Sequence, residues 1–365
     1  MNKHLSGDKM KKLIKPTVLL MCTAFCVYLC TCFEITAKSV ERGIDTGINI
    51  LLPSLFPFFV ISDLLTKLIS SHKGIFTRIF SALFNMPEEA FGAFVCGIIS
   101  GYPVGASAAY SLYEQKSVSK EEAERLICFA NNSGPLFIIC AAGCGMLGSL
   151  KAGIIMYAVH ITSSVITGII CGITVKRAAK EKTALPSAAI RFNPAESIER
   201  GFIQAIKIMG FVIFFAIITD MLLMCAGKAG ISTDSKILTM LMCLIEVTNG
   251  ISLAAGNFDI HTAMCIISFG CGFSGLAVLM QTALVTGNML CLKKYVLYKL
   301  FNAFVSFCLC KIFILASDID FSAISDFRPE AIQVIFIGLC YILFTYYIIA
   351  SKKLVNRYKK NNRES

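Results

Sequence analysis

Long uncharged runs alternate with short polar intervals along this chain. A helix needs about 17 residues or more to span the hydrocarbon core of a bilayer, and seven runs of that length carry almost no charge: 17–33, 46–62, 90–113, 126–150, 152–175, 262–292 and 331–351. Three weaker runs, each interrupted by one or two charges, lie at 201–227, 237–258 and 300–317. The longest polar interval is about 25 residues, which leaves no room for a sizeable soluble domain. The pattern predicts an all-α polytopic membrane protein whose function resides in the membrane.

Composition and charge agree with a membrane location. Hydrophobic residues make up 56% of the 365 positions and charged residues 16%, whereas soluble domains carry about 25% charged residues. The net charge of +11 does not indicate nucleic-acid binding, because the basic residues flank apolar runs and are not interleaved with aromatic residues on one face. Five lysines precede the first run and six basic residues follow the last, so the positive-inside rule places both termini in the cytoplasm. The first run lacks an A-x-A cleavage site and is expected to remain as an anchor.

Cysteine and histidine patterns give no sign of a metal site. Most of the 17 cysteines lie inside apolar runs, no C-x-x-C pair occurs, and the four histidines form no H-x₃-H or H-E-x-x-H pattern. The cysteines are expected to pack as small hydrophobic residues between helices. No Walker sequence, G-x-S-x-G elbow or metalloprotease motif is present either. We therefore expect no metal, no cofactor and no enzymatic activity.

Three basic loops, at 66–89, 176–200 and 293–299, should all lie in the cytoplasm. Three apolar segments separate the first loop from the second, and three more separate the second from the third. An odd number of full crossings cannot return the chain to the same side. One segment of each trio is therefore predicted to be a re-entrant hairpin, which a membrane tolerates only where protein or water satisfies the backbone. The candidates are 121–149 and 261–292, which are long and have polar, glycine-rich centres. The prediction is about eight transmembrane helices plus two re-entrant hairpins.

This assignment gives the two halves of the chain opposite orientations. The first hairpin enters from outside and the second from the cytoplasm, which leaves the acidic segment 318–330 outside. Lys151 then lies on the outer side, against the positive-inside rule. The halves are also similar in sequence, since VERG at 40–43 matches IERG at 198–201 and both hairpin candidates contain an SG pair. Inverted repeats with broken helices are the build of many secondary transporters, and we expect two such repeats here.

The expected domain organisation follows from these repeats. Each repeat contains a span with a polar break, which reads CGIISGYPVGASAA from Cys96 and CLIEVTNGISLAAG from Cys243. The expected parts are a basic N-terminus with the first transmembrane helix (1–39), a first repeat (40–175), a cytoplasmic linker (176–197), a second inverted repeat (198–316), a last transmembrane helix (317–351) and a basic cytoplasmic tail (352–365).

The polar breaks are expected to form a substrate site. A helix interrupted inside the membrane leaves backbone N–H and C=O groups unpaired, at several kcal/mol each if they faced lipid. These groups must therefore face a cavity, a ligand or other polar groups, and the N-terminus of a half-helix attracts carboxylate or phosphate. The candidate substrate-binding residues are Ser100, Gly101, Tyr102, Pro103, Gly105, Asn131, Asn132, Ser133, Gly134, Glu246, Thr248, Asn249, Gly250, Ser274, Gly275 and Gln281.

Two interpretations of these side chains stay open. Most are neutral hydrogen-bonding groups that could select a ligand, but intramembrane Ser, Thr and Asn often only hold helices together. Glu246 is costly inside a membrane, so it should carry a proton, bind a cation or pair with Lys207, a lysine within an apolar helix. A carrier of this build could use either a proton or a sodium ion for coupling.

Several separate motifs carry a family resemblance over residues 40–350. They read NILLPSLFPFFVISDLL, SGYPVGA, EEAERLICFANNSGPLFI, EVTNG and GFSGLAVLMQ, in this order. The chain thereby resembles the sporulation integral membrane proteins of the nucleoside-recognition, or Gate-domain, superfamily. In that family the G-Y-P-x-G-A motif is often followed by lysine, whereas this chain has Ser107.

The resemblance implies a carrier related to the stage V sporulation protein that moves dipicolinic acid from the mother cell across the outer forespore membrane. Its partners would be a small-molecule substrate and the lipid bilayer, and a homo-oligomer is left open. Two alternatives stand beside it. One is a carrier for a nucleoside or related metabolite, and the other is a non-transporting membrane scaffold or sensor for spore envelope assembly.

Overall fold

The chain folds into helices joined by short connections. The structure, a computed structural model, describes residues 2–53, 56, 57, 59–61, 64, 74–174, 194–232, 235–287 and 289–316. No β-strand occurs in these residues, in agreement with the all-helical prediction. The described elements are α1 (Asn2–Thr31), α2 (Phe33–Thr46), η1 (Gly47–Leu51), α4 (Ile75–Phe84), η2 (Glu88–Ala90), α5 (Phe91–Ser100), α6 (Val104–Glu114), α7 (Lys120–Ala130), η3 (Leu136–Met146), α8 (Leu150–Ile173), α9 (Pro194–Lys228), α10 (Lys236–Ile245), α11 (Val247–Asn257), α12 (Ile260–Phe273), α13 (Gly275–Val285) and α14 (Leu292–Ala316).

Three of the predicted parts are wholly or largely outside the described residues. They are the last transmembrane helix (317–351), the basic tail (352–365) and residues 176–193 of the linker. The remaining linker residues, 194–197, form the first turn of α9.

Several helices are long and apolar enough to cross a membrane. Four candidates are α8, α9, α14 and the segment Ile260–Val285, which comprises α12 and α13. Two bent pairs raise the number to six, with bends of 97° between α1 and α2–η1 and 102° between α4 and η2–α5. Four to six candidate spans within the described residues make the chain an integral membrane protein.

Two pairs of short helices fold back as hairpins. Three residues separate α5 from α6, and Glu246 alone separates α10 from α11. A Cβ atom added to Gly97 would lie 3.2 Å from the Cα atom of Gly105, and one added to Gly250 would lie 2.6 Å from that of Cys243. In a straight helix, residues seven or eight apart rise by more than about 10 Å. The arms of each hairpin are therefore antiparallel and in close contact.

The prediction of a hairpin at 121–149 is wrong, because this segment runs as one broken helix along α8. A Cβ atom on Gly143 of η3 would lie 2.4 Å from the Cα atom of Gly153, near the start of α8. At the other end, the hydroxyl of Ser164 donates to the carbonyl oxygen of Phe129 in α7 at 2.6 Å. Residue numbers therefore fall from 143 to 129 along η3 and α7 while those of their contacts on α8 rise from 153 to 164. The two stretches are antiparallel, and the first is interrupted at 131–135.

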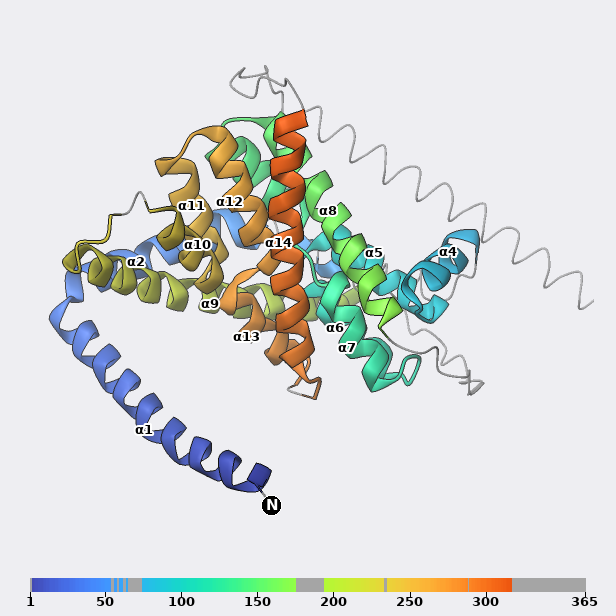
Figure 1. The fold of residues 1–365 in the computed structure, drawn as a ribbon, viewed down its shortest axis with the longest axis horizontal. Helices are drawn as coiled ribbons and strands as arrows, with labels where there is room; N and C mark the ends of the chain where they lie inside the picture. Colours follow the sequence, from blue (N-terminus) through green and yellow to red (C-terminus); the bar gives the residue numbers. More distant parts are fainter. Residues whose placement is uncertain are drawn as a thin grey trace, which may run out of the picture. The chain divides into compact units, whose positions relative to one another are not determined.

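The second predicted hairpin, at 261–292, is wrong for the same reason. Residues Ile260–Val285 form one membrane-length segment with a break at Ser274. The amide of Asn302 in α14 donates to the carbonyl oxygen of Gly272 at 3.1 Å, and α12 lies beside α14, with α13 toward the lower end of α14 in this view (Figure 1). Two consecutive residues with positive φ, Ser274 at 80° and Gly275 at 84°, redirect the backbone without reversing the helix. The reversals occur instead where a glycine of one arm faces the other arm.

Two long helices carry the paired sequence motifs of the two halves. A Cβ atom on Gly43 of α2 would lie 2.8 Å from the Cα atom of Ile213 in α9, so the two backbones touch. Arg42 forms an ion pair with Asp220 of α9. The VERG motif of the first half thus contacts the long helix that begins the second half.

An aromatic cluster packs around α7, which is the first arm of the broken helix formed by α7 and η3. The ring of Phe129 stacks on that of Phe84 with centroids 4.9 Å apart, and it also contacts Phe80 and Phe94. These rings come from α4, α5 and α7, and Phe129 is 1% exposed. Burial of such rings contributes through apolar area and ring geometry, and it places the break that follows Ala130 in the protein interior.

Candidate functional site

The break after α7 is bonded to three other helices. Asn131 donates from Nδ2 to the hydroxyls of Thr282 in α13 and Tyr295 in α14, at 3.0 and 2.9 Å. Its Oδ1 atom accepts from the backbone N–H of Ala106 in α6 at 3.3 Å. All these atoms are buried, so one asparagine joins the first broken helix to the first hairpin and to two helices of the opposite half.

The next two residues contact α8. Asn132 donates from Nδ2 to the hydroxyl of Ser164 at 3.0 Å, and the backbone N–H of Ser133 donates to Nε2 of His160 at 3.1 Å. His160 therefore carries its ring proton on Nδ1. Among the described residues, neither His160 Nδ1 nor Asn132 Oδ1 has a hydrogen-bond partner, although both are buried. The first break thus keeps unsatisfied polar atoms in the interior.

The two breaks meet at one carbonyl group. The hydroxyl of Ser133 donates to the carbonyl oxygen of Cys271 at 3.3 Å, and the hydroxyl of Ser274 donates to the same oxygen at 3.3 Å. Ser133 and Ser274 belong to the matching SG pairs of the two halves, and both are fully buried. The sequence-predicted residues of the two breaks are therefore brought together in space.

Each hairpin tip packs against the break of its own half. Gly101, with φ of 81°, leaves no room for a side chain because an added Cβ atom would lie 2.7 Å from the backbone nitrogen of Gly134. Gly275, with φ of 84°, would place a Cβ atom 3.2 Å from the backbone nitrogen of Val247 at the second tip. The positive φ and the close approach both favour glycine at these two positions.

In each hairpin, a side chain caps the N-terminus of the second arm, which is α6 in the first hairpin and α11 in the second. Asn131 bonds to the first turn of α6, as described above, and both oxygens of Glu246 accept backbone N–H groups at the start of α11, from Thr248 at 3.0 Å and Asn249 at 2.8 Å. Glu246 was expected to carry a proton, bind a cation or pair with Lys207. Its recorded contacts are those of a helix cap, a role that suits a carboxylate because of the helix dipole. Lys207 is exposed on α9.

The N-termini that follow the two breaks differ from those of the hairpins. No side-chain cap occupies the start of η3 at Pro135 or the start of α13 at Ser274. Each carries the partial positive charge of a helix N-terminus. These two half-helices, rather than the hairpin arms, offer ends that suit an anion.

Other sequence-predicted residues lie at the edge of this arrangement. Ser100 and Gln281 are buried, whereas Thr248 and Asn249 are half-buried. Gln281 and Pro103 border a narrow crevice with Lys207 that is too small to hold a water molecule. Ser107, which follows the GYPVGA motif, is exposed on α6.

Polar faces of α8 and α14 complete the arrangement and were missed from the sequence. They comprise His160, Ser163, Ser164 and Thr167 on α8, and Tyr295, Lys299, Asn302 and Ser306 on α14. Spacings of three and four residues put each set on one helix face, and that spacing was the available signal. Lys299 was expected in a cytoplasmic loop at 293–299. This expectation is wrong, because α14 begins at Leu292 and Lys299 is 1% exposed.

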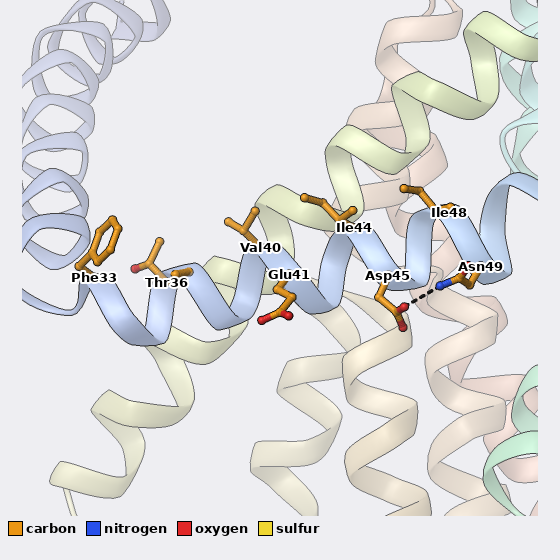
Figure 2. A pocket seen from close by; sticks show the side chains of 9 residues that line it. Phe33, Thr36, Val40, Glu41, Ile44, Asp45, Ile48 and Asn49 are labelled. Carbon is orange, nitrogen blue, oxygen red and sulfur yellow. Dashed lines mark hydrogen bonds between the residues drawn. The ribbon is translucent and has the colours of Figure 1, made fainter.

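An open space beside the described residues lies away from the two breaks. It measures about 590 Å³ and follows one face of α2 and η1, where Glu41 and Asp45 alternate with apolar residues such as Val40 and Ile44 (Figure 2). Asn49 donates to Asp45 at 2.6 Å across one helical turn. Because one helical stretch borders this space, it is a surface groove. It lies outside the region where the two breaks meet.

One curated protein is similar to most of the chain. The chain is 25% identical over 310 residues to the sporulation integral membrane protein YlbJ of Bacillus subtilis (strain 168), which covers 74% of this chain and 76% of that protein. No known family profile matches the chain, and no solved structure matches it. The similarity and the apolar helices support a sporulation integral membrane protein.

Proposed function

We propose that this chain is a secondary carrier that moves a small carboxylate, dipicolinate, from the mother cell across the outer forespore membrane. The observation that carries the proposal is the meeting of two broken helices, with both hairpin tips packed on the breaks, at the carbonyl group of Cys271. Broken helices that converge in the interior of a membrane protein supply polar backbone for a substrate. A purely structural bundle would gain nothing from interrupting its helices there.

The two halves are proposed to be inverted repeats. Each half has a hairpin, then a broken helix, then a long helix with a polar face: α5 to α8 in the first half and α10 to α14 in the second. The contact between Arg42 and Asp220 links the starting helices of the two halves. Repeats related in this way allow alternating access, in which one unit rocks against the other around a central site.

The charge distribution gives the proposed topology. Moving the hairpin within each trio of apolar segments leaves the number of crossings unchanged. The basic segments 66–89 and 176–200 and the exposed Lys293 and Lys294 at the start of α14 can therefore still lie inside. The first hairpin, α5–α6, then enters from the cytoplasm and the second, α10–α11, from outside. Both termini remain cytoplasmic.

The chemistry of the breaks favours an anionic substrate. The starts of η3 and α13 lack side-chain caps, and half-helix N-termini attract carboxylates. Dipicolinate is a flat aromatic dianion, and the family resemblance points to it. The relative YlbJ, named as a sporulation integral membrane protein, supports the sporulation context.

Uptake of labelled dipicolinate into proteoliposomes tests the proposal. Purified protein should give uptake above protein-free liposomes, and an imposed proton or sodium gradient should reveal the coupling ion. Spores of a deletion strain should lack dipicolinate while its synthesis in the mother cell continues. Normal spore content together with no uptake in liposomes would disprove the substrate assignment, and uptake of nucleosides alone would favour a nucleoside carrier.

A scaffold function is the second candidate, and the bonding of Asn131 favours it. The structure records three hydrogen bonds of this side chain, and all three are made with other groups of the protein. This is expected for a residue that holds helices together. Alanine substitution at Asn131 would then impair a scaffold and a carrier alike. Transport itself, measured in liposomes, distinguishes the two.

A further inference from the structure

Lys299 is a buried cation with no partner in the part of the chain that the structure describes. It lies in the second turn of α14, is 1% exposed, and its Nζ atom makes no hydrogen bond there. Its recorded contact is with the ring of Tyr295, whose centroid lies 5.9 Å from Nζ. A desolvated ammonium without a counter-ion is among the most costly groups in a protein interior.

Neighbours on the same face of α14 place Lys299 in the region where the two breaks meet. Tyr295, four residues earlier, accepts from Asn131 at the first break. Asn302, three residues later, donates to the carbonyl oxygen of Gly272 beside the second break. Residues spaced by three and four lie on one helix face, so Lys299 faces the region between the two breaks.

The surroundings supply no carboxylate for this ammonium. The two buried carboxylates of the described residues are both used by backbone groups, Glu124 by the N–H of Cys291 and Glu246 by the start of α11. His160 and the thiol of Cys271 lie within electrostatic range of Lys299, and neither is an anion under ordinary conditions. The uncapped starts of η3 and α13 add further positive potential.

We infer that Lys299 supplies the positive charge that binds a carboxylate group of the transported molecule. The inference rests on the proposed carrier function and replaces Lys207 as the charge partner. An ammonium buried near two uncapped half-helix ends lacks a counter-ion that would offset its desolvation, and an anion would supply it. A substrate carboxylate would satisfy it during transport, and departure of the substrate would leave it unpaired again.

Binding to the purified protein in detergent tests the inference. The ligands are dipicolinate and its neutral isostere pyridine-2,6-dicarboxamide, measured by calorimetry. Lys299→Gln should weaken dipicolinate binding about 10- to 100-fold, because a charge-assisted hydrogen bond is lost, and should leave the affinity for the diamide within about threefold. Lys299→Arg keeps the charge and should bind more tightly than Lys299→Gln. The matched control Lys311→Gln, an exposed lysine on the same helix, should bind dipicolinate as the wild type does.

A second measurement keeps the inference falsifiable if Lys299→Gln does not fold. In protein with isotope-labelled lysine, the resonance that disappears in Lys299→Arg should shift when dipicolinate is added and stay in place with the diamide. Wild-type affinity in Lys299→Gln, or no shift of that resonance in protein that binds dipicolinate, would overturn the role of Lys299 alone. A wild-type protein that neither binds nor transports a carboxylate would overturn the proposed function as well.

Discussion

Ser133 and Ser274 donate hydrogen bonds to the same acceptor, the carbonyl oxygen of Cys271, each at 3.3 Å. The two serines lie 141 positions apart (274 − 133) and belong to different halves of the chain. Their shared acceptor shows that the interruptions of two helices form one structural feature. A disturbance of either break should therefore be felt in both halves.

The first prediction concerns the close contact inside the first hairpin. Gly97→Ala should destabilise the protein by about 3 kcal/mol, because an overpacked interior must shift, and the added Cβ atom would lie 1.7 Å from the carbonyl oxygen of Ala130. Gly256→Ala, where nothing lies within 4 Å of the added atom, should be neutral or stabilise α11 by about 0.5–1 kcal/mol. Thermal unfolding in detergent compares the two variants. Equal unfolding temperatures would contradict the packing of α7 into this hairpin.

The second prediction concerns Asn131 as a junction. Asn131→Ala should cost about 2–3 kcal/mol, since it leaves the N–H of Ala106 and two hydroxyls without their partner in the interior. Tyr295→Phe removes one of these bonds and should cost about 1 kcal/mol. The double variant should be less destabilised than the sum of the single variants, because the two residues share a bond. Strict additivity in unfolding experiments would argue against the direct contact.

The third prediction concerns Glu246. Glu246→Ala should lower stability by about 1–2 kcal/mol through loss of the cap on α11, with Glu246→Gln between the alanine variant and the wild type because one oxygen acceptor remains. Both variants are compared by unfolding temperature and by uptake with a proton gradient. If Glu246→Gln kept its full stability and lost only the response to the gradient, proton coupling rather than capping would be its role.

The fourth prediction concerns topology. With the hairpins at α5–α6 and α10–α11, the connection after α6 should face the cytoplasm and the connection after α11 should face outside. Gln115→Cys, directly after α6, and Gly256→Cys, in the last turn of α11, are both exposed positions. They report on the two connections in a background without other cysteines. A membrane-impermeant thiol reagent added outside should label the second and spare the first. The reverse pattern would restore the hairpins to 121–149 and 261–292.

Positions of the breaks follow from local sequence. Glycine, proline and small polar residues weaken a helix wherever they occur, and runs of apolar residues separated by basic loops suffice to indicate a membrane protein. The sequence was enough to predict that Asn131, Ser133, Ser274 and the hairpin tips belong to one site, because these polar and glycine-rich motifs stand out against apolar surroundings. The local patterns do not say whether a break bends a helix or reverses it.

Tertiary contacts decide that question, and they also decide the role of Lys299. Reversal at α5–α6 depends on Gly97 facing Gly105 across the hairpin and on the carbonyl group of Ala130 packing against both glycines, a contact between segments that a linear pattern does not contain. Lys299 resembles a loop residue because it follows two other lysines closely in the sequence. Its burial arises only when α14 packs on α8, α7 and α12. By itself, the sequence determined that the chain enters the membrane as interrupted helices. Only the packing of those helices decided which interruptions turn back and which charge they enclose, because backbone approach and desolvation depend on neighbours in space.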